Sequence, residues 1–230
     1  DERKNNMSLL MLGDNEKLVI PAQLRQNCQI APGTQSFRFG RHRAPPNRTE
    51  MPPFEVVITH LELDLADFKP KLSERTDVSF SHVGPLLPEL NRFFYATIGA
   101  QWSWLDRRPW TLFRWTEHLA NRDRIETWIL SVAGVPAGYA ELERKREGRV
   151  EIAFLGLLSA FIGGGLGAHL LTCAVERAVA MGAAKVLLNT CNLDHPMARG
   201  NYEARGFRAV RTEVKNKDIP TVPPGPWEGA

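Results

Sequence analysis

The stretch Ile162-Gly163-Gly164-Gly165-Leu166-Gly167 decides the fold of this chain. It follows an apolar, strand-like run, Val150–Leu157, and it opens a helical pattern that continues to about Met181. A strand, a glycine-rich turn and a helix start in that order form a cradle for an anion, because the first N–H groups of a helix lack intrahelical partners. The helix dipole adds roughly half a positive charge at the same end, and glycines let a phosphate approach the backbone without a Cβ in the way.

Two phosphate-binding patterns can be compared with this loop. The nucleotide P-loop requires a Lys and a Ser or Thr after its last glycine, and Ala168-His169 in that place exclude it. The dinucleotide pattern G-x-G-x-x-A is matched by Gly163, Gly165 and Ala168, but it also requires an acidic residue about 20 positions further on, at the end of the next strand. That strand ends in Asn189-Thr190, and Asp194 follows in a loop. A dinucleotide site therefore stays an alternative that rests on a partial match.

Hydrophobic periodicity places further elements on both sides of the glycine loop. Alternating and β-branched runs predict strands, and apolar residues at helical spacing predict helices, whereas residues 67–83 are polar and irregular. Strands in runs with helices between them indicate an α/β fold with a mixed sheet. Strands are expected over Phe54–Leu63, Thr127–Val132, Pro136–Glu143, Val150–Leu157, Lys185–Thr190 and Phe207–Val214, and helices over Leu86–Ile98, Pro109–Ala120, 166–181 and Pro196–Arg205.

The composition narrows the class of partner. The 230 residues are 43% hydrophobic and 24% charged, which is the balance of a folded domain, and no apolar run approaches the ~20 residues of a membrane span. The net charge of +3 lies entirely in residues 1–50, since the remainder carries equal numbers of basic and acidic residues. Neither a nucleic acid nor a membrane is therefore expected as a partner.

We expect three parts along the chain: a flexible N-terminal extension over 1–50, a folded domain over 51–216 and a flexible C-terminal tail over 217–230. Three cysteines are too few for a disulfide framework, and free thiols favour a reducing compartment. No N-terminal signal peptide is visible, so a cytoplasmic location is expected. The dispersed histidines and cysteines show no ligand spacing, and we expect no metal site.

At the glycine loop the chain resembles the GNAT superfamily of N-acetyltransferases, whose loop reads Q/R-x-x-G-x-G/A. Residues 125–214 resemble the family closely, and 54–124 do so loosely. The resemblance continues in order through the hairpin Gly134-Val135-Pro136-Ala137-Gly138-Tyr139, the strand Glu151–Leu158, His195-Pro196-Met197-Ala198 and Tyr202-x-x-x-Gly206-Phe207.

Two short segments are similar to a bacterial branch of that family. Trp102-Ser103-Trp104-Leu105-Asp106-Arg107 reads W-x-W-x-x-R, and Leu193-Asp194-His195-Pro196 reads L-D-H-P. The chain also departs from the family pattern at two positions. Ile162 stands where the loop usually begins with Gln or Arg, and His195 stands where Asn is common.

The resemblance implies a mixed, mostly antiparallel central sheet that is flanked by helices and splayed at the strand before the loop. It also implies acetyl-CoA as co-substrate and transfer of its acetyl group, by direct attack, to a primary amine of a small molecule or peptide. A non-catalytic acyl-CoA-binding module is the alternative, and a homodimer is among the assemblies we consider. The cofactor-binding residues implied are Leu155, Gly156 and Leu157 for the pantetheine arm, Gly163, Gly164, Gly165, Leu166, Gly167 and Ala168 for the pyrophosphate, and His195.

The same resemblance implies the catalytic residues. Tyr202 matches the tyrosine that protonates the departing thiolate, and Glu151 stands where members often carry a catalytic or water-orienting carboxylate; Glu141 and Glu143 are alternatives for the base. In the family architecture the residues before the hairpin wall the acceptor site. We therefore expect the acceptor to contact an aromatic face and one of several charges, formed by Trp102, Trp104, Asp106 and Arg107.

Overall fold

The computed structural model describes residues 54–220 and Gly225. Seven strands form a single sheet in the order β2-β3-β4-β5-β6-β1-β7. The strands are β1 (Phe54–Asp64), β2 (Val78–His82), β3 (Ile125–Val132), β4 (Val135–Arg144), β5 (Arg149–Leu157), β6 (Lys185–Cys191) and β7 (Arg208–Lys217). The helices are α2 (Pro88–Gly99), α3 (Leu112–Leu119), α4 (Leu166–Ala180) and α5 (Ala198–Ala204), with short 3₁₀ turns η1 (Leu65–Asp67) and η2 (Ser159–Phe161).

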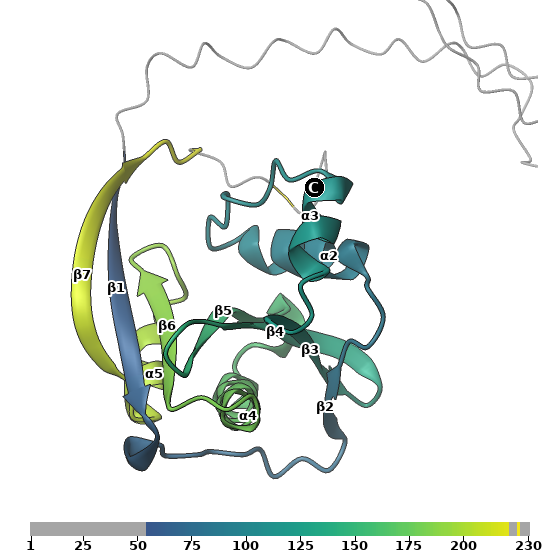
Figure 1. Ribbon diagram of the computed structural model, residues 1–230, viewed down its shortest axis with the longest axis vertical. Helices are drawn as coiled ribbons and strands as arrows, with labels where there is room; N and C mark the ends of the chain where they lie inside the picture. Colours follow the sequence, from purple (N-terminus) through teal and green to yellow (C-terminus); the bar gives the residue numbers. More distant parts are fainter. Residues whose placement is uncertain (1–53, 221–224, 226–230) are drawn as a thin grey trace, which may run out of the picture. The chain divides into compact units, whose positions relative to one another are not determined.

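The helices cover the two faces of the sheet separately. In Figure 1, α2 and α3 lie on one side of β3, β4 and β5, and α4 lies on the other. The larger hydrophobic core joins α4 to the sheet, and two smaller, aromatic clusters join the sheet to α2 and α3. Every neighbouring pair of strands is antiparallel except β5 and β6. The α/β fold with a mixed sheet that the residue patterns predict, and the mostly antiparallel arrangement that the family resemblance implies, are thereby confirmed.

Most expected elements are found within a few residues of their predicted ends, with three differences. Residues 67–83 do not lack regular structure, since Val78–His82 pairs with β3 as an edge strand. Helix α3 begins at Leu112 rather than Pro109, because the Thr111 side chain caps it by accepting a hydrogen bond from the N–H of Arg114. Strand β7 continues through Lys217.

Strands β5 and β6 part halfway along the sheet. Their parallel pairing is limited to three residue pairs and ends at Glu151 opposite Leu187. Two residues further on, Ala153 has no partner opposite it in β4, because Glu141 pairs with Phe154 and Leu142 with Ile152. Such a bulge bends the strand that contains it. The bend carries the end of β5 away from β6, and residues 153–157 are half-exposed although β5 is an interior strand.

A buried glutamate ties α2 and α3 to the sheet. Glu141 of β4 is fully buried, and its carboxylate accepts hydrogen bonds from Arg107 (2.8 and 3.1 Å), from His118 of α3 (2.9 Å) and from Asn91 of α2 (3.2 Å). Burial opposes ionisation of Glu141, but the hydrogen bond from His118 and the charge of Arg107 outweigh it, so the pKa of Glu141 is lowered. The carboxylate is therefore held as an anion within the protein.

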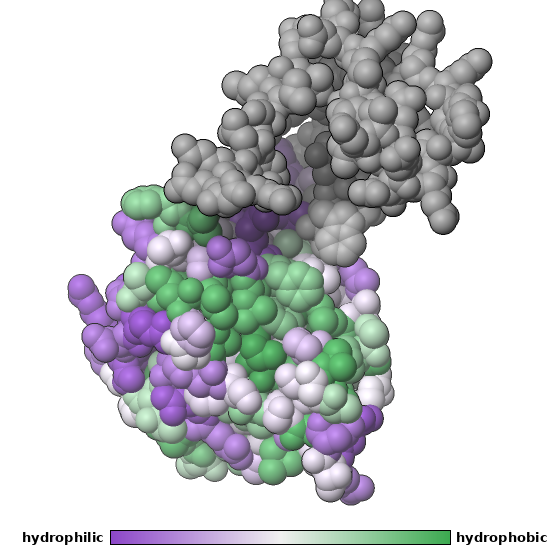
Figure 2. Space-filling model, turned by 90° about the vertical axis from the view of Figure 1, so that its right-hand side faces the viewer, coloured by the Kyte–Doolittle hydropathy of each residue, from purple (hydrophilic) through white to green (hydrophobic). Residues whose placement is uncertain are grey.

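The surface of the domain is partly apolar. Figure 2 shows hydrophobic residues gathered at the middle of one face, with hydrophilic residues around them. Exposed apolar side chains also occur just before α2 (Leu87), within α2 (Phe93) and in the first turn of α3 (Phe113). No helix in the described part of the chain is long and apolar enough to cross a membrane. The predicted extension over 1–50 and most of the predicted tail, 221–224 and 226–230, lie outside the described residues.

We predict that Glu141→Gln lowers the free energy of unfolding by about 3–5 kcal/mol, because it leaves the charge of Arg107 buried without a counter-ion. The matched control is Glu62→Gln, which removes a partly exposed partner of Lys185 and costs about 1 kcal/mol or less. Urea unfolding followed by tryptophan fluorescence measures both values. Equal losses in the two variants would show that the Glu141 network does not stabilise the fold.

The lowered pKa of Glu141 also sets the sign of a pH effect. Its contribution to stability is complete above the ordinary pKa range of a glutamate and is lost as the pH falls through the lower pKa of the folded state. The urea midpoint of the unmodified protein should therefore fall on acidification, and the fall should be smaller in Glu141→Gln. A parallel decline in both proteins would contradict this assignment.

Candidate active site

A cavity of about 940 Å³ opens where β5 and β6 part. Its walls come from β5, β6, the glycine loop, α5 and the segment between α2 and α3. Most residues that the sequence analysis selected line it, including Trp102, Trp104, Asp106, Arg107, Glu151, Leu155, Gly156, Leu157, Gly163, Gly165, Gly167, Ala168, His195 and Tyr202. The fold therefore brings one side of the glycine loop, the splayed strand and the tryptophan segment to a single space.

The glycine loop presents backbone N–H groups to this cavity. Gly163 and Gly165 have positive φ angles of 96° and 76°, and a Cβ built on either would meet nothing within 4 Å. Gly165 is the N-cap of α4, and no side chain caps that helix end. The N–H groups at the start of α4 are thus free to bind an anion. Ala168 differs from the expectation, because its N–H already bonds to the carbonyl of Gly165 at 3.2 Å.

The register of β4 and β5 decides which backbone groups face the gap. The N–H of Leu158 donates to the carbonyl of Ala137 at 2.8 Å, and Leu157 lies opposite Gly138. Because hydrogen-bonded and non-bonded pairs alternate in an antiparallel ladder, Gly156 pairs with β4, and Leu155 and Leu157 turn their N–H and C=O groups toward β6. The family resemblance implies that Leu155, Gly156 and Leu157 all offer backbone groups to a ligand. In the structure only Leu155 and Leu157 do so.

Gly156 has a different use, in close packing. A Cβ on Gly156 would come within 2.5 Å of Cγ2 of Ile98 and within 3.4 Å of the Trp104 ring. The missing side chain lets α2 and the tryptophan segment lie directly against β5. Gly156 thus shapes the wall of the cavity, and its backbone belongs to the sheet.

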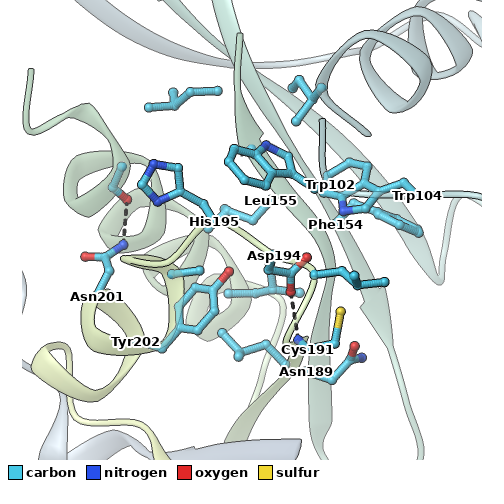
Figure 3. A pocket seen from close by; sticks show the side chains of 18 of the residues that line it. Trp102, Trp104, Phe154, Leu155, Asn189, Cys191, Asp194, His195, Asn201 and Tyr202 are labelled. Atoms are coloured by element: carbon cyan, nitrogen blue, oxygen red, sulfur yellow. Dashed lines mark hydrogen bonds between the residues drawn. The ribbon is translucent and has the colours of Figure 1, made fainter. Parts of the chain in front are cut away.

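Tyr202 and Asp194 meet at the other side of the gap (Figure 3). Tyr202 of α5 is half-buried and lines the cavity. Burial, and then the negative charge of Asp194, raise the pKa of Tyr202 above its usual value. Its phenol therefore stays protonated at neutral pH and can act as a proton donor. Asp194 follows β6, and its Oδ2 accepts hydrogen bonds from the Thr190 hydroxyl (2.7 Å) and the Cys191 N–H (2.9 Å).

The carboxylates considered as the base are all engaged in ion pairs. Glu151 and Glu143 share the ammonium of Lys145, at 2.7 and 2.8 Å, and the amide of Asn189 also donates to Glu151 at 3.4 Å. Glu141 is sealed inside the network with Arg107. The structure therefore disfavours the expected role of Glu151, because a bound amine would have to displace Lys145 to reach its carboxylate.

Aromatic side chains form the wall that faces Tyr202. Trp104 packs against Tyr95 and Phe154, with ring centroids 5.6 and 5.1 Å apart. Trp102 lies edge-on to the His195 ring at 5.0 Å. His195 also uses Nδ1 to accept a hydrogen bond from the N–H of Met197, which makes it a cap for the turn that leads into α5.

The two charged residues of the expected acceptor site already have partners. The guanidinium of Arg107 lies between the rings of Trp110 (4.6 Å) and Phe154 (4.4 Å), and Glu141 neutralises it. Asp106 is 77% exposed and pairs with Lys217 at 3.0 Å. The expectation that either charge binds the acceptor is therefore disfavoured, since each would first have to give up an ion pair.

Several residues that line the cavity were not selected from the sequence. Lys71 and Arg205 bring positive charge, and the Nε atom of Arg205 is buried without a hydrogen-bond partner in the described chain. Asn201 ties α5 to the glycine loop, since its amide donates to the carbonyl of Gly167 at 3.2 Å. Asp194 also lines the cavity, and it alone among these residues was noted in the sequence, as the acidic residue of the L-D-H-P segment. Lys71 lies far from the loop in sequence, in a segment without periodicity.

The arrangement suits an extended ligand with an anionic end. Such a ligand would lie along the free backbone groups of Leu155 and Leu157 and would place its phosphates at the glycine loop, near the unpaired Nε of Arg205. A dinucleotide site is not supported. Its pattern belongs to a parallel sheet, and here the pair β5–β6 is the single parallel contact among the described strands.

Comparisons with known proteins agree with this geometry. Residues 86–207, more than half of the chain, match the model of the acetyltransferase (GNAT) family. No curated protein matches the chain. A GCN5-related N-acetyltransferase from Sphaerobacter thermophilus is similar in structure, with a TM-score of 0.55 and 18% identity over 76% of this chain and 54% of that one.

A tandem GNAT protein from the clavulanic acid biosynthesis pathway gives a TM-score of 0.53 and 18% identity over 73% of this chain and 53% of that one. The chain thus spans about half the length of these two structures, and at this identity the likeness shows the fold alone. The family match covers the hairpin, the splayed strand, the glycine loop and Tyr202. The chain therefore belongs to the GNAT family of acetyltransferases.

Proposed function

We propose that this protein transfers an acetyl group from acetyl-CoA to a primary amine of a small molecule or peptide. One observation carries the proposal: the gap between β5 and β6 places the free N–H groups of Leu155 and Leu157 in one cavity with the uncapped start of α4 and the hydroxyl of Tyr202. Acyl transfer from a thioester needs these three features, which hold the donor, stabilise an oxyanion and protonate a thiolate.

The residues take separate parts in this reaction. The glycine loop binds the pyrophosphate, while Leu155 and Leu157 form sheet-like hydrogen bonds with the pantetheine arm. The N–H of Leu157 stabilises the oxyanion that develops on the thioester carbonyl. The hydroxyl of Tyr202, whose pKa is raised by burial and by Asp194, gives its proton to the leaving sulfur. Trp102 and Trp104 exclude water from the side where the acceptor enters.

A binding and turnover experiment tests the proposal. Calorimetry should show that the full chain binds acetyl-CoA, and a thiol reagent should detect free coenzyme A when a panel of amines is added. The panel is 2-phenylethylamine, tryptamine, spermidine, phenylalanine amide and a peptide with a free N-terminus. Binding without thiol release for every amine would support a non-catalytic acyl-CoA-binding module, and absence of binding would refute both functions.

We predict that Tyr202→Phe lowers kcat by about 10²-fold or more, because the thiolate then leaves without a proton donor. The affinity for acetyl-CoA should stay within threefold of the unmodified protein, since the phenyl ring preserves the contact with Phe207. Stopped assays with the best amine of the panel and calorimetry provide the two numbers. Unchanged turnover would remove Tyr202 from the mechanism.

Two glycines of the loop should respond differently when each is replaced by alanine. Gly165→Ala forces a Cβ into a left-handed conformation and should cost about 1 kcal/mol of stability and at least tenfold in acetyl-CoA affinity. Gly167 is in helical conformation, and a Cβ there would meet only the Asn201 amide, at 3.9 Å. Gly167→Ala should therefore preserve both the stability and the affinity for acetyl-CoA. Urea unfolding and calorimetry compare them. Equal losses in the two variants would show that loop conformation does not govern binding.

A further inference from the structure

Four carboxylates line the cavity: Asp106, Glu143, Glu151 and Asp194. The first three are neutralised by lysines, since Asp106 pairs with Lys217, and Glu143 and Glu151 share Lys145. Asp194 makes no ion pair with any residue in the described part of the chain. A cationic ligand that enters this cavity therefore meets one uncompensated negative charge, at Asp194.

The local structure holds the Asp194 side chain in a fixed orientation. Oδ2 accepts the hydrogen bonds of Thr190 and Cys191, which link the side chain to the end of β6, while Oδ1 forms no hydrogen bond with the described residues. In Figure 3 the carboxylate points into the cavity, with Trp102 and Trp104 beyond it and Tyr202 beside it. Its charge acts on both neighbouring acids, because it raises the pKa of Tyr202 and of Cys191 in addition to the effect of burial.

We propose that Asp194 binds the amino group of the acceptor and takes the proton that this group loses during transfer. Oδ1 receives the hydrogen bond of the bound ammonium, and the aromatic rings of Trp102 and Trp104 enclose the carbon skeleton next to it. The acceptor is thus a primary amine that binds as a cation, with an apolar or aromatic body. This inference rests on the function proposed above, and it assigns the base that Glu151 was expected to supply.

The proton balance of the step is complete without another reactant. Asp194 first passes one proton of the ammonium to solvent, which leaves a neutral amine. The amine nitrogen then forms a bond to the thioester carbonyl carbon, and the carbon–sulfur bond breaks. Asp194 takes the remaining surplus proton from nitrogen, while Tyr202 gives its own proton to the sulfur. Transfer from protonated Asp194 to the Tyr202 phenolate restores both groups, and the products are the N-acetyl amine and coenzyme A.

The first experiment compares turnover in three variants of the full chain. Asp194→Asn keeps an oxygen that can accept from Thr190 and Cys191, so the loop is preserved while the charge is lost. We expect kcat/KM for 2-phenylethylamine to fall by about 10²–10⁴-fold. Thr190→Val removes a hydrogen bond of the loop without touching the charge, and Glu151→Gln removes the competing carboxylate. Both should lose clearly less activity than Asp194→Asn.

The second experiment does not depend on turnover. The protein is saturated with coenzyme A, and calorimetry measures the binding of 2-phenylethylamine and of its uncharged analogue 2-phenylethanol. The amine should bind more tightly than the alcohol, and Asp194→Asn should weaken amine binding by about ten- to a hundredfold while it leaves the alcohol unchanged. Because this measurement needs no acetyl transfer, it separates a failure of the Asp194 assignment from a failure of the proposed function.

Three results would overturn the proposal. The first is a kcat/KM of Asp194→Asn within threefold of the unmodified protein while that protein releases thiol. The second is a loss in Glu151→Gln or Thr190→Val that equals or exceeds the loss in Asp194→Asn. The third is binding of the amine no tighter than that of the alcohol in the unmodified protein, or an equal weakening of both ligands in Asp194→Asn.

Discussion

The separation of β5 from β6 is the constraint on which the rest of the structure depends. A central strand normally uses its backbone groups on both sides, and an interior gap would leave polar groups without partners. Here the parallel pairing stops at Glu151, and the bulge at Ala153 turns the strand away. The free groups of Leu155 and Leu157 then face a cavity instead of a neighbour. The sheet thus gives up hydrogen bonds in its middle and gains a groove that an extended ligand can complete as if it were a strand.

A gap of this kind weakens the sheet, and the packing on both faces compensates for it. On one face, α4 bridges the two halves through the large core. On the other face, α2 and α3 rest on β3, β4 and β5, where the Glu141 network and the aromatic clusters hold them. Because Arg107 belongs to both the network and the cavity wall, the position of the acceptor wall is fixed from inside the protein. The wall is therefore held in place by contacts within the fold itself.

The sequence was sufficient for the order of elements, since apolar periodicity and the glycine loop predict the order of the main strands and all the helices. It was insufficient for β2, because the alternation of Val78, Ser79, Phe80 and Ser81 is short and lies within a polar stretch, in an edge strand that pairs on one side only. The sequence also could not show which charged residues form ion pairs with each other. Glu151, Arg107 and Asp106 have the residue types that a site requires, but each is neutralised by a residue distant in sequence or on another element. Pairing of this kind depends on three-dimensional register, which residue spacing does not contain.

The unpaired charges make the two ends of the cavity electrostatically different. The domain as a whole is close to neutral, so its net charge does not attract an anionic donor. Within the cavity, however, Lys71 and Arg205 form no ion pair with described residues and lie with the start of α4, while Asp194 is the unpaired charge on the opposite side of Tyr202. The phosphates of a thioester donor would meet positive charge at one end of the cavity. An incoming ammonium would meet the negative charge of Asp194 at the other end. The other carboxylates that line the cavity are already paired with lysines, so they would compete less for an incoming ammonium than Asp194 does.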